Sequence, residues 1–457
     1  MEIRGYVEEH RERFLSELVE YCRIPSVAAA GTGLEEARGF ATEQLERLGA
    51  TVTPLDVPGA RGPAILGALG PASAPRTLLI YNHYDVQPPE PLDEWDSPPF
   101  EPTERGGALF GRGVADNKAN FLSRAQAVEA WLATRGDLPV RILWLLEGEE
   151  EIGSPSLPDV CRQHGHLWSG ADGCLWEAGY KDQAGRMVLY SGLKGLAAFE
   201  LTARCASSDM HSSWATLVPN AAWRLVWALA TLKDRDENIL IDGLMDAVAP
   251  PTPAERRFVE QIPYDDEAFR VAHGVPEFVT GVTGSDALMR HLYQPTCTIT
   301  GLSSGYSGPD MKTVLPSVAV AKVGFRLVPD LTPELVDEML RRHLLETGFE
   351  DIEVTTLAGE RPAPGQVESA VVRSALAAVE DVSGVAPVLW PHMAGTGPMY
   401  EVCAQYGIPA VGFGTGYFGS LVHAPNENVR LADYFEGIEV ASEFIDRFAS
   451  ITGYRPM

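Results

Sequence analysis

The sequence contains few cysteines, and no two of them are close together. The six cysteines lie at positions 22, 161, 174, 205, 297 and 403, and none forms a CxxC pair. A disulfide framework or a thiolate zinc site would need cysteines grouped at characteristic spacings. We therefore expect neither, and we predict a reducing, cytoplasmic location.

Positive charge is also scarce. The chain has 36 Lys and Arg against 63 Asp and Glu, which gives a formal net charge of −27. Proteins that bind nucleic acid need clustered Lys and Arg to displace counterions, so nucleic acid is not an expected partner. The acidity would suit divalent cations, but solubility alone would also explain it.

Long apolar runs are missing as well. No run approaches the roughly 20 residues that a membrane-spanning helix needs. Residues 1–22 have the pattern of one charged amphipathic helix and lack the apolar core and cleavage site of a secretory signal. The sequence thus predicts neither export nor insertion into a membrane.

The chain is long enough for at least two domains, because 457 residues exceed the size at which one core stops growing. Strand-like runs at 77–81 and 140–146 alternate with a helical pattern at 121–134. This alternation favours an α/β domain with a mixed, largely parallel sheet flanked by helices.

The pattern changes near residue 191. A helix near 219–233 and strands at 296–302 and 318–330 predict an inserted α+β domain. The catalytic domain would then be discontinuous, with residues 1–190 and 359–457 on either side of an insertion at 191–358. Within it we expect helices at 370–382 and 431–451, and loops in the Pro- and Gly-rich pieces 59–75 and 359–366.

Polar residues follow three of the apolar runs. His83 and Asp85 follow RTLLIYN, Glu147 to Glu151 follow VRILWLL, and Glu177 follows DGCLW. Ligands of open α/β sheets bind beyond the carboxyl ends of the strands. We therefore expect these side chains to share one site.

Each cluster has a chemical and a plainer interpretation. In HYDVQP, His83 and Asp85 lie on one face of an extended strand, as a metal ligand and its orienting carboxylate would. Asp116 follows a glycine-rich turn, where it would be a bridging carboxylate or simply a helix N-cap. His423 lies in a loop before the last helix, and an ordinary loop histidine is its plainer interpretation.

The run Glu149, Glu150, Glu151 is harder to explain as surface charge. Adjacent carboxylates repel one another unless they are solvated or bound to a cation, and this run directly follows a buried-type strand. Two imidazoles with several carboxylates match the nitrogen and oxygen ligands that zinc accepts, and they suit a dinuclear centre.

With these motifs the sequence resembles the di-zinc peptidase family of carnosine dipeptidases, glutamate carboxypeptidases and aminoacylases, the carnosinase-like branch most of all. The resemblance covers nearly the whole chain and rests on motifs in the family's order: HYDVQP, GRGVADNKAN, EGEEEIGS, the Glu177 segment, SSDMHSS, KTVLP, FRLVPDLTPE and VHAPNENV. It implies a zinc-binding catalytic domain and an inserted lid or dimerisation domain.

The resemblance also implies a role for each metal ligand. His83 and Glu177 would bind one zinc ion, Glu151 and His423 would bind a second, and Asp116 would bridge the two. Cobalt or manganese would be substitutes, because oxygen-rich sites discriminate weakly between such metals.

Further roles follow from the same resemblance. Glu150 would be the general base, Asp85 would orient His83, and His211 would polarise the scissile carbonyl, commonly in the partner subunit's site. The substrate's carboxylate would be held by Arg326, Thr313 and Thr396.

Some positions depart from the family pattern. Asn117 stands where many members have Asp, Ala119 stands where Gly is frequent, and the GGS-x-P segment is AGTGP at 394–398. Residues 367–369 also lack a histidine that some carnosinases have. These departures concern substrate preference more than catalysis.

The predicted function is hydrolysis of an amide bond in a small dipeptide-like substrate with a free carboxylate, by a water that Glu150 activates. An N-acyl or N-carbamoyl amino acid is the alternative substrate, and a non-catalytic binding protein of the same fold is the alternative class. We expect a homodimer formed through the inserted domain, because two-fold dimers are the commonest soluble assembly.

Overall fold

The computed structural model describes residues 2–451. The chain divides into two compact units, each treated separately below. The first unit comprises Met1–Gly192, Gly365–Pro391 and Pro398–Met457, and the second comprises Leu193–Pro364 and His392–Gly397. Within the described residues, no helix is both long and apolar enough to cross a membrane.

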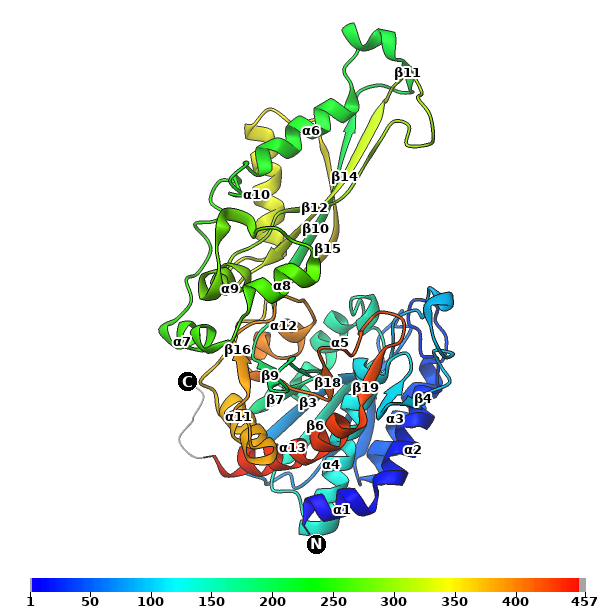
Figure 1. The fold of residues 1–457 in the computed structure, drawn as a ribbon, viewed down its shortest axis with the longest axis vertical. Helices are drawn as coiled ribbons and strands as arrows, with labels where there is room; N and C mark the ends of the chain where they lie inside the picture. The colour runs from blue at the N-terminus through cyan, green and yellow to red at the C-terminus, as the bar shows by residue number, and fades with distance from the viewer. Residues whose placement is uncertain (1, 452–457) are drawn as a thin grey trace. The chain divides into compact units, whose positions relative to one another are not determined.

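A mixed ten-stranded sheet organises the first unit (Figure 1). Its strands are, along the chain, β1 (Thr51–Leu55), β2 (Ala64–Leu69), β3 (Thr77–His83), β6 (Arg141–Glu147), β7 (Gly173–Trp176), β8 (Tyr180–Lys181), β9 (Met187–Tyr190), β16 (Val388–Trp390), β17 (Ala410–Gly412) and β18 (Gly416–Tyr417). The spatial order is β1-β2-β6-β3-β7-β17-β9-β8-β18, with β16 paired to β9. The four strands β6, β3, β7 and β17 run parallel at its centre.

Helices flank this sheet, namely α1 (Ile3–Glu9), α2 (Arg11–Cys22), α3 (Leu34–Arg47), α4 (Ala119–Arg135), α5 (Leu157–His164), α11 (Ala370–Ser383), α12 (Met399–Val402) and α13 (Leu431–Ser450). Helix α13 packs against both α11 and α4 (Figure 1). β3 and β6 are buried over all but their first residue, as expected for strands covered on both faces. The predicted α/β class with a mixed sheet flanked by helices is confirmed.

A small sheet joins two distant parts of the first unit. It contains β4 (Thr103–Arg105), β5 (Ala108–Phe110) and β19 (Asn428–Arg430), in the order β19-β5-β4. Strand β19 pairs antiparallel with β5, so the segment after His423 lies beside the segment that leads to Asp116.

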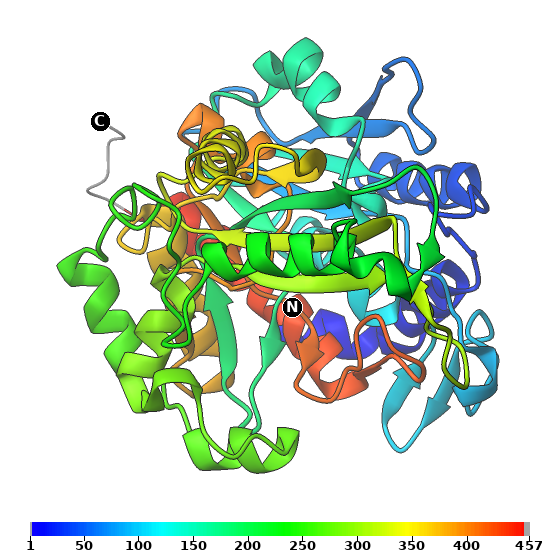
Figure 2. The ribbon, with the colours of Figure 1, turned by 90° about the horizontal axis from the view of Figure 1, so that it is seen from above.

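The second unit is built on an antiparallel four-stranded sheet, β12 (Thr298–Ser304), β14 (Val318–Leu327), β10 (Gly195–Arg204) and β15 (Glu353–Glu360), in that order. Its helices are α6 (Ala221–Leu232), α7 (Pro253–Gln261), α8 (Asp266–His273), α9 (Gly284–Tyr293) and α10 (Pro333–Glu346). Helix α6 lies along the strands of this sheet (Figure 2) and contacts β10 and β14. Alternate residues of β10, such as Phe199, pack with Phe325 of β14 into the core. Two short strands, β11 (Met210–His211) and β13 (Val314–Leu315), pair separately.

Three local predictions were wrong in part. The piece 59–75 is not only loop, because its apolar centre forms β2, which is buried between β1 and β6. The predicted single helix at 1–22 is two helices, which meet at His10, whose backbone is not helical (φ −104, ψ 10). The piece 359–366 begins as the last two residues of β15. Residue 1 and residues 452–457 of the predicted segments lie outside the described residues.

Candidate metal centre

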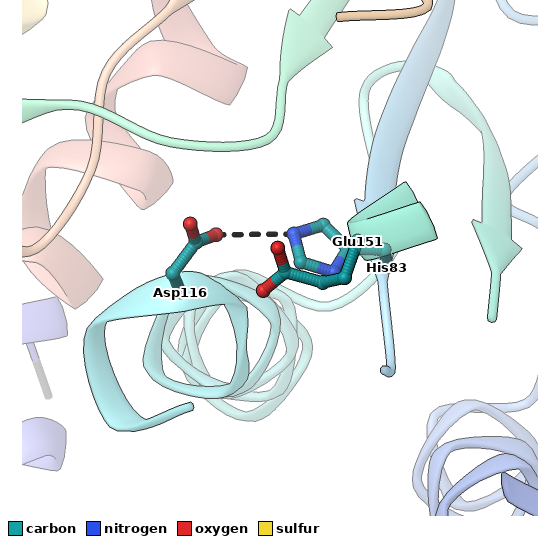
Figure 3. Close-up of side chains that lie close together, drawn as sticks. All are labelled: His83, Asp116 and Glu151. Carbon is teal, nitrogen blue, oxygen red and sulfur yellow. Dashed lines mark hydrogen bonds and ion pairs between the residues drawn. The ribbon is translucent and has the colours of Figure 1, made fainter. Parts of the chain in front are cut away.

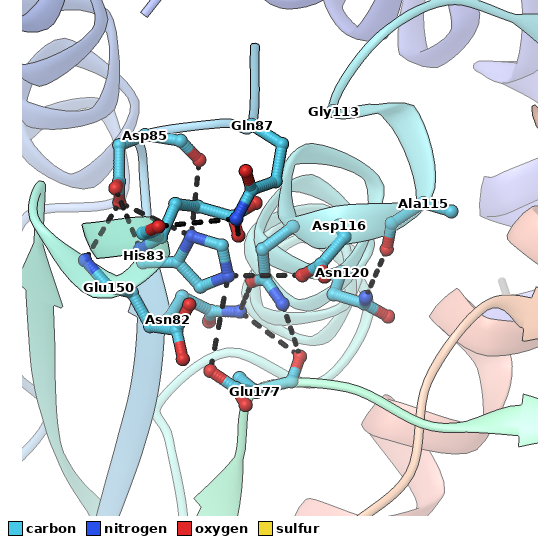
Figure 4. Close-up of polar contacts among 12 residues, drawn as sticks. Asn82, His83, Asp85, Gln87, Gly113, Ala115, Asp116, Asn120, Glu150 and Glu177 are labelled. Atoms are coloured by element: carbon cyan, nitrogen blue, oxygen red, sulfur yellow. Dashed lines mark hydrogen bonds and ion pairs between the residues drawn. The ribbon is translucent and has the colours of Figure 1, made fainter. Parts of the chain in front are cut away.

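The carboxyl ends of three neighbouring parallel strands supply most of the site. Strand β3 ends at His83, β7 is followed directly by Glu177, and β6 leads into the short helical turn Glu150–Ile152. Because β3 lies between β6 and β7, these polar ends meet at one edge of the sheet. Figure 4 shows the side chains of His83, Glu177 and Asp116 converging there.

Asp116 enters from a separate turn. It lies in the short helical turn Val114–Lys118, where its own φ of −128° and ψ of 90° are not helical. Gly113, with φ of 79°, begins the turn, and a Cβ at this position would lie 2.2 Å from Cγ1 of Val86. Glycine is therefore required for the close approach that brings Asp116 to the strand ends.

The two carboxylate oxygens of Asp116 face two different imidazoles. Oδ1 lies 3.1 Å from Nε2 of His83, and Oδ2 lies 3.2 Å from Nε2 of His423 (Figure 3 for His83). On the His423 side, Nε2 is also 3.2 Å from Oε2 of Glu151. On the other side, Oε2 of Glu177 is 3.9 Å from Nε2 of His83. The five predicted ligands therefore lie together, in two groups that share Asp116.

The donor set fits a metal ion. His83, Asp116 and Glu151 each offer a ligand atom, and these atoms lie within 4.8 Å of one another (Figure 3). Oε2 of Glu177 is buried and, within residues 2–451, accepts no hydrogen bond, whereas Oε1 accepts one from Trp176 Nε1 at 3.2 Å. A buried carboxylate oxygen without a donor is costly unless a cation faces it. Nitrogen and oxygen donors of this kind suit zinc and related ions.

Electrostatics give the same indication. Burial, together with the nearby carboxylate of Glu177, raises the pKa of Glu150 well above its ordinary value. Burial also raises the pKa of Glu177, to about 7, while hydrogen bonds to Asp116 and Glu151 raise that of His423 to about 10. Burial alone would raise the pKa of Asp116, but its hydrogen bonds to His423 and His83 lower that pKa below the ordinary range. The cluster thus holds protons that a divalent cation would displace.

Asp85 connects the histidine to the glutamate turn. Its Oδ1 lies 3.4 Å from Nδ1 of His83, and this nitrogen is also 3.1 Å from the Asp85 carbonyl oxygen. The same carboxylate accepts the backbone N–H groups of Glu151, at 3.0 Å, and Glu150, at 3.3 Å. Asp85 is fully buried, so it holds both elements in one orientation (Figure 4).

Four supporting residues were not predicted from the sequence. Gln87 donates to Oε2 of Glu151 at 2.9 Å, Trp176 donates to Glu177, and Asn117 donates to the Glu177 carbonyl oxygen at 3.0 Å. The fourth is Glu427, which accepts the Asp116 backbone N–H at 3.0 Å. Gln87, Asn117 and Glu427 lie inside the motifs HYDVQP, GRGVADNKAN and VHAPNENV, and that position was the only available signal.

The remaining predicted residues lie in the second unit and form two pairs. His211 on β11 has Nε2 3.4 Å from Oγ1 of Thr313, and its Nδ1 lies 2.9 Å from Oγ of Ser213. Arg326 on β14 donates from Nη1 to Oγ1 of Thr396. The roles proposed for these residues stay predictions.

Comparison with known proteins identifies relatives along nearly the whole chain. The profile of peptidase family M20/M25/M40 matches residues 79–447. Beta-Ala-His dipeptidase of Mus musculus is 28% identical over 464 residues, which cover 96% of this chain and 93% of that protein. Cys-Gly metallodipeptidase of Schizosaccharomyces pombe is 28% identical and covers 98% of both chains. The crystal structure of an M20 family metallo-carboxypeptidase from Sulfolobus solfataricus superposes with a TM-score of 0.90 and 35% identity, over 96% of this chain and 99% of the other.

Proposed function

The chain belongs to peptidase family M20/M25/M40, and from this premise we propose that it is a zinc-dependent hydrolase of dipeptide-like substrates with a free carboxylate. The observation that carries the proposal is the arrangement around Asp116. Its two oxygens face two histidines, and each histidine has a second carboxylate beside it. This is the arrangement expected for a carboxylate that bridges two cations.

Two zinc ions would be held by this cluster. His83 and Glu177 would hold one, His423 and Glu151 the other, and Asp116 both, with cobalt or manganese as substitutes. When bound, the ions would acidify a water toward neutral pH and polarise the substrate carbonyl. The orphaned Oε2 of Glu177 supports this assignment.

Glu150 is the proposed general base. It follows β6 beside Glu151, and Asp85 accepts its backbone N–H at 3.3 Å, which holds the turn that carries it. It would accept a proton from the attacking water at a carboxylate oxygen and return that proton to the departing amine.

Groups of the second unit would bind and polarise the substrate. The guanidinium of Arg326, beside Thr396, suits a carboxylate because it offers several donors in a fixed plane. Thr313 would contribute a further donor. His211 would donate to the carbonyl oxygen as negative charge develops on it. The relatives' names support such a substrate, since a dipeptidase and a carboxypeptidase both act on peptides next to a free carboxyl end.

A homodimer through the second unit is also proposed. Trp223 and Trp227 on α6 are stacked, with ring centroids 5.8 Å apart, and are 57% and 55% exposed. Strand β12 lies at an edge of its sheet and exposes Ile299 and Leu302. An exposed apolar helix face and an exposed strand edge are each suited to pairing with a second copy. A cytoplasmic location is proposed as well, and the six free cysteines support it.

A substrate panel tests the proposal. The protein would be stripped with a chelator, reloaded with Zn²⁺, and assayed for kcat/KM on dipeptides, their C-terminal amides, and N-acetyl and N-carbamoyl amino acids. We expect dipeptides to be hydrolysed best and the amides poorly. A preference for N-acetyl or N-carbamoyl amino acids would replace the substrate class and retain the chemistry. Full activity in chelator would reject the metal, and no hydrolysis of any compound would favour a binding protein.

A further inference from the structure

The loop that carries His423 has an unusual backbone. Leu421, His423 and Asn426 have φ angles of 52°, 65° and 62°, in the left-handed region that residues other than glycine rarely adopt. Such conformations persist only where the surroundings fix them. The His423 side chain is itself 52% exposed, so packing does little to hold it. The position of this imidazole therefore depends on what anchors the loop.

Three consecutive residues, Asn426, Glu427 and Asn428, anchor the loop at its carboxyl end, and we call them the NEN triplet. Asn426 ties the loop to the segment near residue 95, because its Oδ1 accepts the Asp96 N–H and its Nδ2 donates to the Glu94 carbonyl oxygen, each at 2.9 Å. These two bonds fix the far side of the loop.

Asn428 closes the base of the loop. Its Nδ2 donates to the carbonyl oxygens of Gly419 and Asn426, both at 3.0 Å, and its Oδ1 accepts the hydroxyl of Tyr417 at 2.7 Å. Its backbone N–H also donates to the Ser420 carbonyl oxygen at 2.9 Å. The two asparagines thus hold the loop that contains His423 as a closed structure.

Glu427 makes the connection to the metal cluster. Its Oε2 accepts the N–H of Gly113 at 2.8 Å and Nη1 of Arg112 at 2.7 Å, and its Oε1 accepts the N–H groups of Ala115 at 2.9 Å and Asp116 at 3.0 Å. The side chain is 1% exposed. Both oxygens are engaged by the protein, so Glu427 is a support for the centre and not a ligand.

We propose that Glu427 is a positioning residue that holds the turn of Asp116 in register with the loop of His423, and that the metal ion on the His423 side depends on it. The other side has a different support. His83 ends a buried strand, is 1% exposed and is fixed by Asp85. This inference rests on the proposed dinuclear centre and adds an asymmetry to it.

Arg112 depends on Glu427 to compensate its buried charge. This guanidinium is 1% exposed, its Nε and Nη2 find no hydrogen-bond partner within the described residues, and Glu427 is its ion-pair partner. Glu427→Gln alone would leave a buried charge uncompensated, which destabilises proteins strongly. The double variant Arg112→Leu/Glu427→Gln removes both charges together. Asn426→Ala is a milder variant that releases only the far side of the loop.

The experiment titrates metal-free protein with Zn²⁺ by calorimetry and with Co²⁺ by visible absorption, while melting temperature reports folding. His423→Ala identifies which of the two binding events belongs to the His423 side. We expect this event to weaken by about 10–100-fold in Glu427→Gln and in the double variant Arg112→Leu/Glu427→Gln. This is the usual range for groups that orient ligands. Asn426→Ala should weaken this event less. The other event shares Asp116 but has its own support in Asp85, so it should weaken by a clearly smaller factor than the event on the His423 side.

Glu17→Gln is the matched control. Glu17 is also a buried carboxylate of the first unit, 8% exposed, and accepts hydrogen bonds from Gln126 and Arg13. It should leave both binding events unchanged even if the melting temperature falls. If the Glu427 variants left both binding events unchanged, or weakened both equally, the inference about Glu427 would be wrong. The dinuclear centre would still stand. A wild type that binds a single ion would overturn the dinuclear centre and the inference together.

Discussion

The two units of the molecule hold their candidate functional residues in different ways. In the first unit His83 and Asp85 are almost fully buried, and hydrogen bonds or ion pairs connect them to Asp116 and the Glu150 turn. In the second unit His211 and Thr313 are both exposed, and their side chains approach only to 3.4 Å. The His83 side of the metal cluster is therefore buried and fixed by its own unit, whereas His211, whose ring contacts Ser213, is open to solvent.

This difference suggests which unit activates the water and which one polarises the substrate carbonyl. A carboxylate and imidazole cluster at buried strand ends keeps its geometry before any substrate arrives, as an activating centre must. A hydrogen bond from an exposed histidine is weak in water and becomes strong only where water is excluded. We infer that activation of water is built into the first unit, and that polarisation by His211 is conditional on a closed or assembled state.

The largest effect should come from replacing Glu150, the proposed general base. Glu150→Gln should lower kcat by about 10²–10⁴-fold, the usual contribution of general base catalysis, and should leave bound metal unchanged. Glu151→Gln should instead weaken metal binding, because Oε2 of Glu151 faces His423. Turnover and elemental analysis of the same samples distinguish the two. Near wild-type turnover of Glu150→Gln would show that another group is the base.

A smaller effect is expected from replacing His211, whose contribution we infer to depend on a closed or assembled state. His211→Ala should lower kcat by about 10²–10³-fold, the cost of losing one donor to the developing oxyanion. Its melting temperature should be unchanged because the side chain is exposed. Ser213→Ala, which removes a neighbour of the same ring, is a control that should cost less.

Mixing the His211→Ala and Glu150→Gln proteins then tests in which subunit's site His211 acts. If it acts in the partner's site, a mixed dimer of His211→Ala and Glu150→Gln chains has one intact site. Random exchange should then restore about one quarter of wild-type activity, because half of the dimers are mixed. No recovery, with subunit exchange verified by differently tagged chains, would place His211 in its own subunit's site.

Much of the first unit could be predicted from the sequence, because its central strands are continuous apolar runs that end in polar clusters. β3 and β6 were recognisable in this way, and so were His83 and the Glu150 turn. β2 was not, because its six residues lie between glycines and prolines that suggest a loop. Its strand character depends on burial between β1 and β6, which composition does not reveal.

The supports of the site were harder to predict than its candidate ligands. The residue types of the ligands are themselves a chemical signal, and the order of the motifs added the resemblance. Glu427 gives no such signal, because its role depends on hydrogen bonds to residues more than 300 positions earlier in the chain. Gln87 is similar, since nothing in HYDVQP indicates that its amide faces Glu151. The roles of His211 and Arg326 rest on the resemblance and stay predictions.

The next effect concerns binding in the second unit. Arg326→Ala should raise KM for a dipeptide by about 10–100-fold, since a hydrogen bond to a charged group contributes about 1.5–3 kcal/mol. It should change little for the C-terminal amide of the same dipeptide, which lacks the carboxylate. Lys322→Ala removes an exposed cation from the same strand and is the control. Equal losses on both substrates would assign Arg326 to structure, through its bond to Thr396.

The smallest effect contrasts the two units through pH. Burial lowers the pKa of His392, in the second unit, to about 4. In the first unit burial raises the pKa of Glu147 to about 8. Between these values and the ordinary ones, the unfolded chain binds more protons at His392 and fewer at Glu147 than the folded chain does. The His392 contribution to stability therefore falls as pH drops from 6.5 toward 4, whereas that of Glu147 falls as pH rises from 4.5 toward 8.

Urea unfolding of the metal-free protein at pH 6.5 and pH 5.5 measures this contrast. Lowering the pH from 6.5 to 5.5 should reduce the free energy of unfolding of wild type relative to His392→Gln by about 1 kcal/mol. The reason is that the unfolded histidine gains a proton that the buried one does not. Glu147→Gln should give a difference of the opposite sign. His273→Gln, at an exposed histidine of the second unit, should leave the pH dependence of wild type unchanged. If His392→Gln and His273→Gln showed the same pH dependence, burial of His392 would not be a source of acid sensitivity in the second unit.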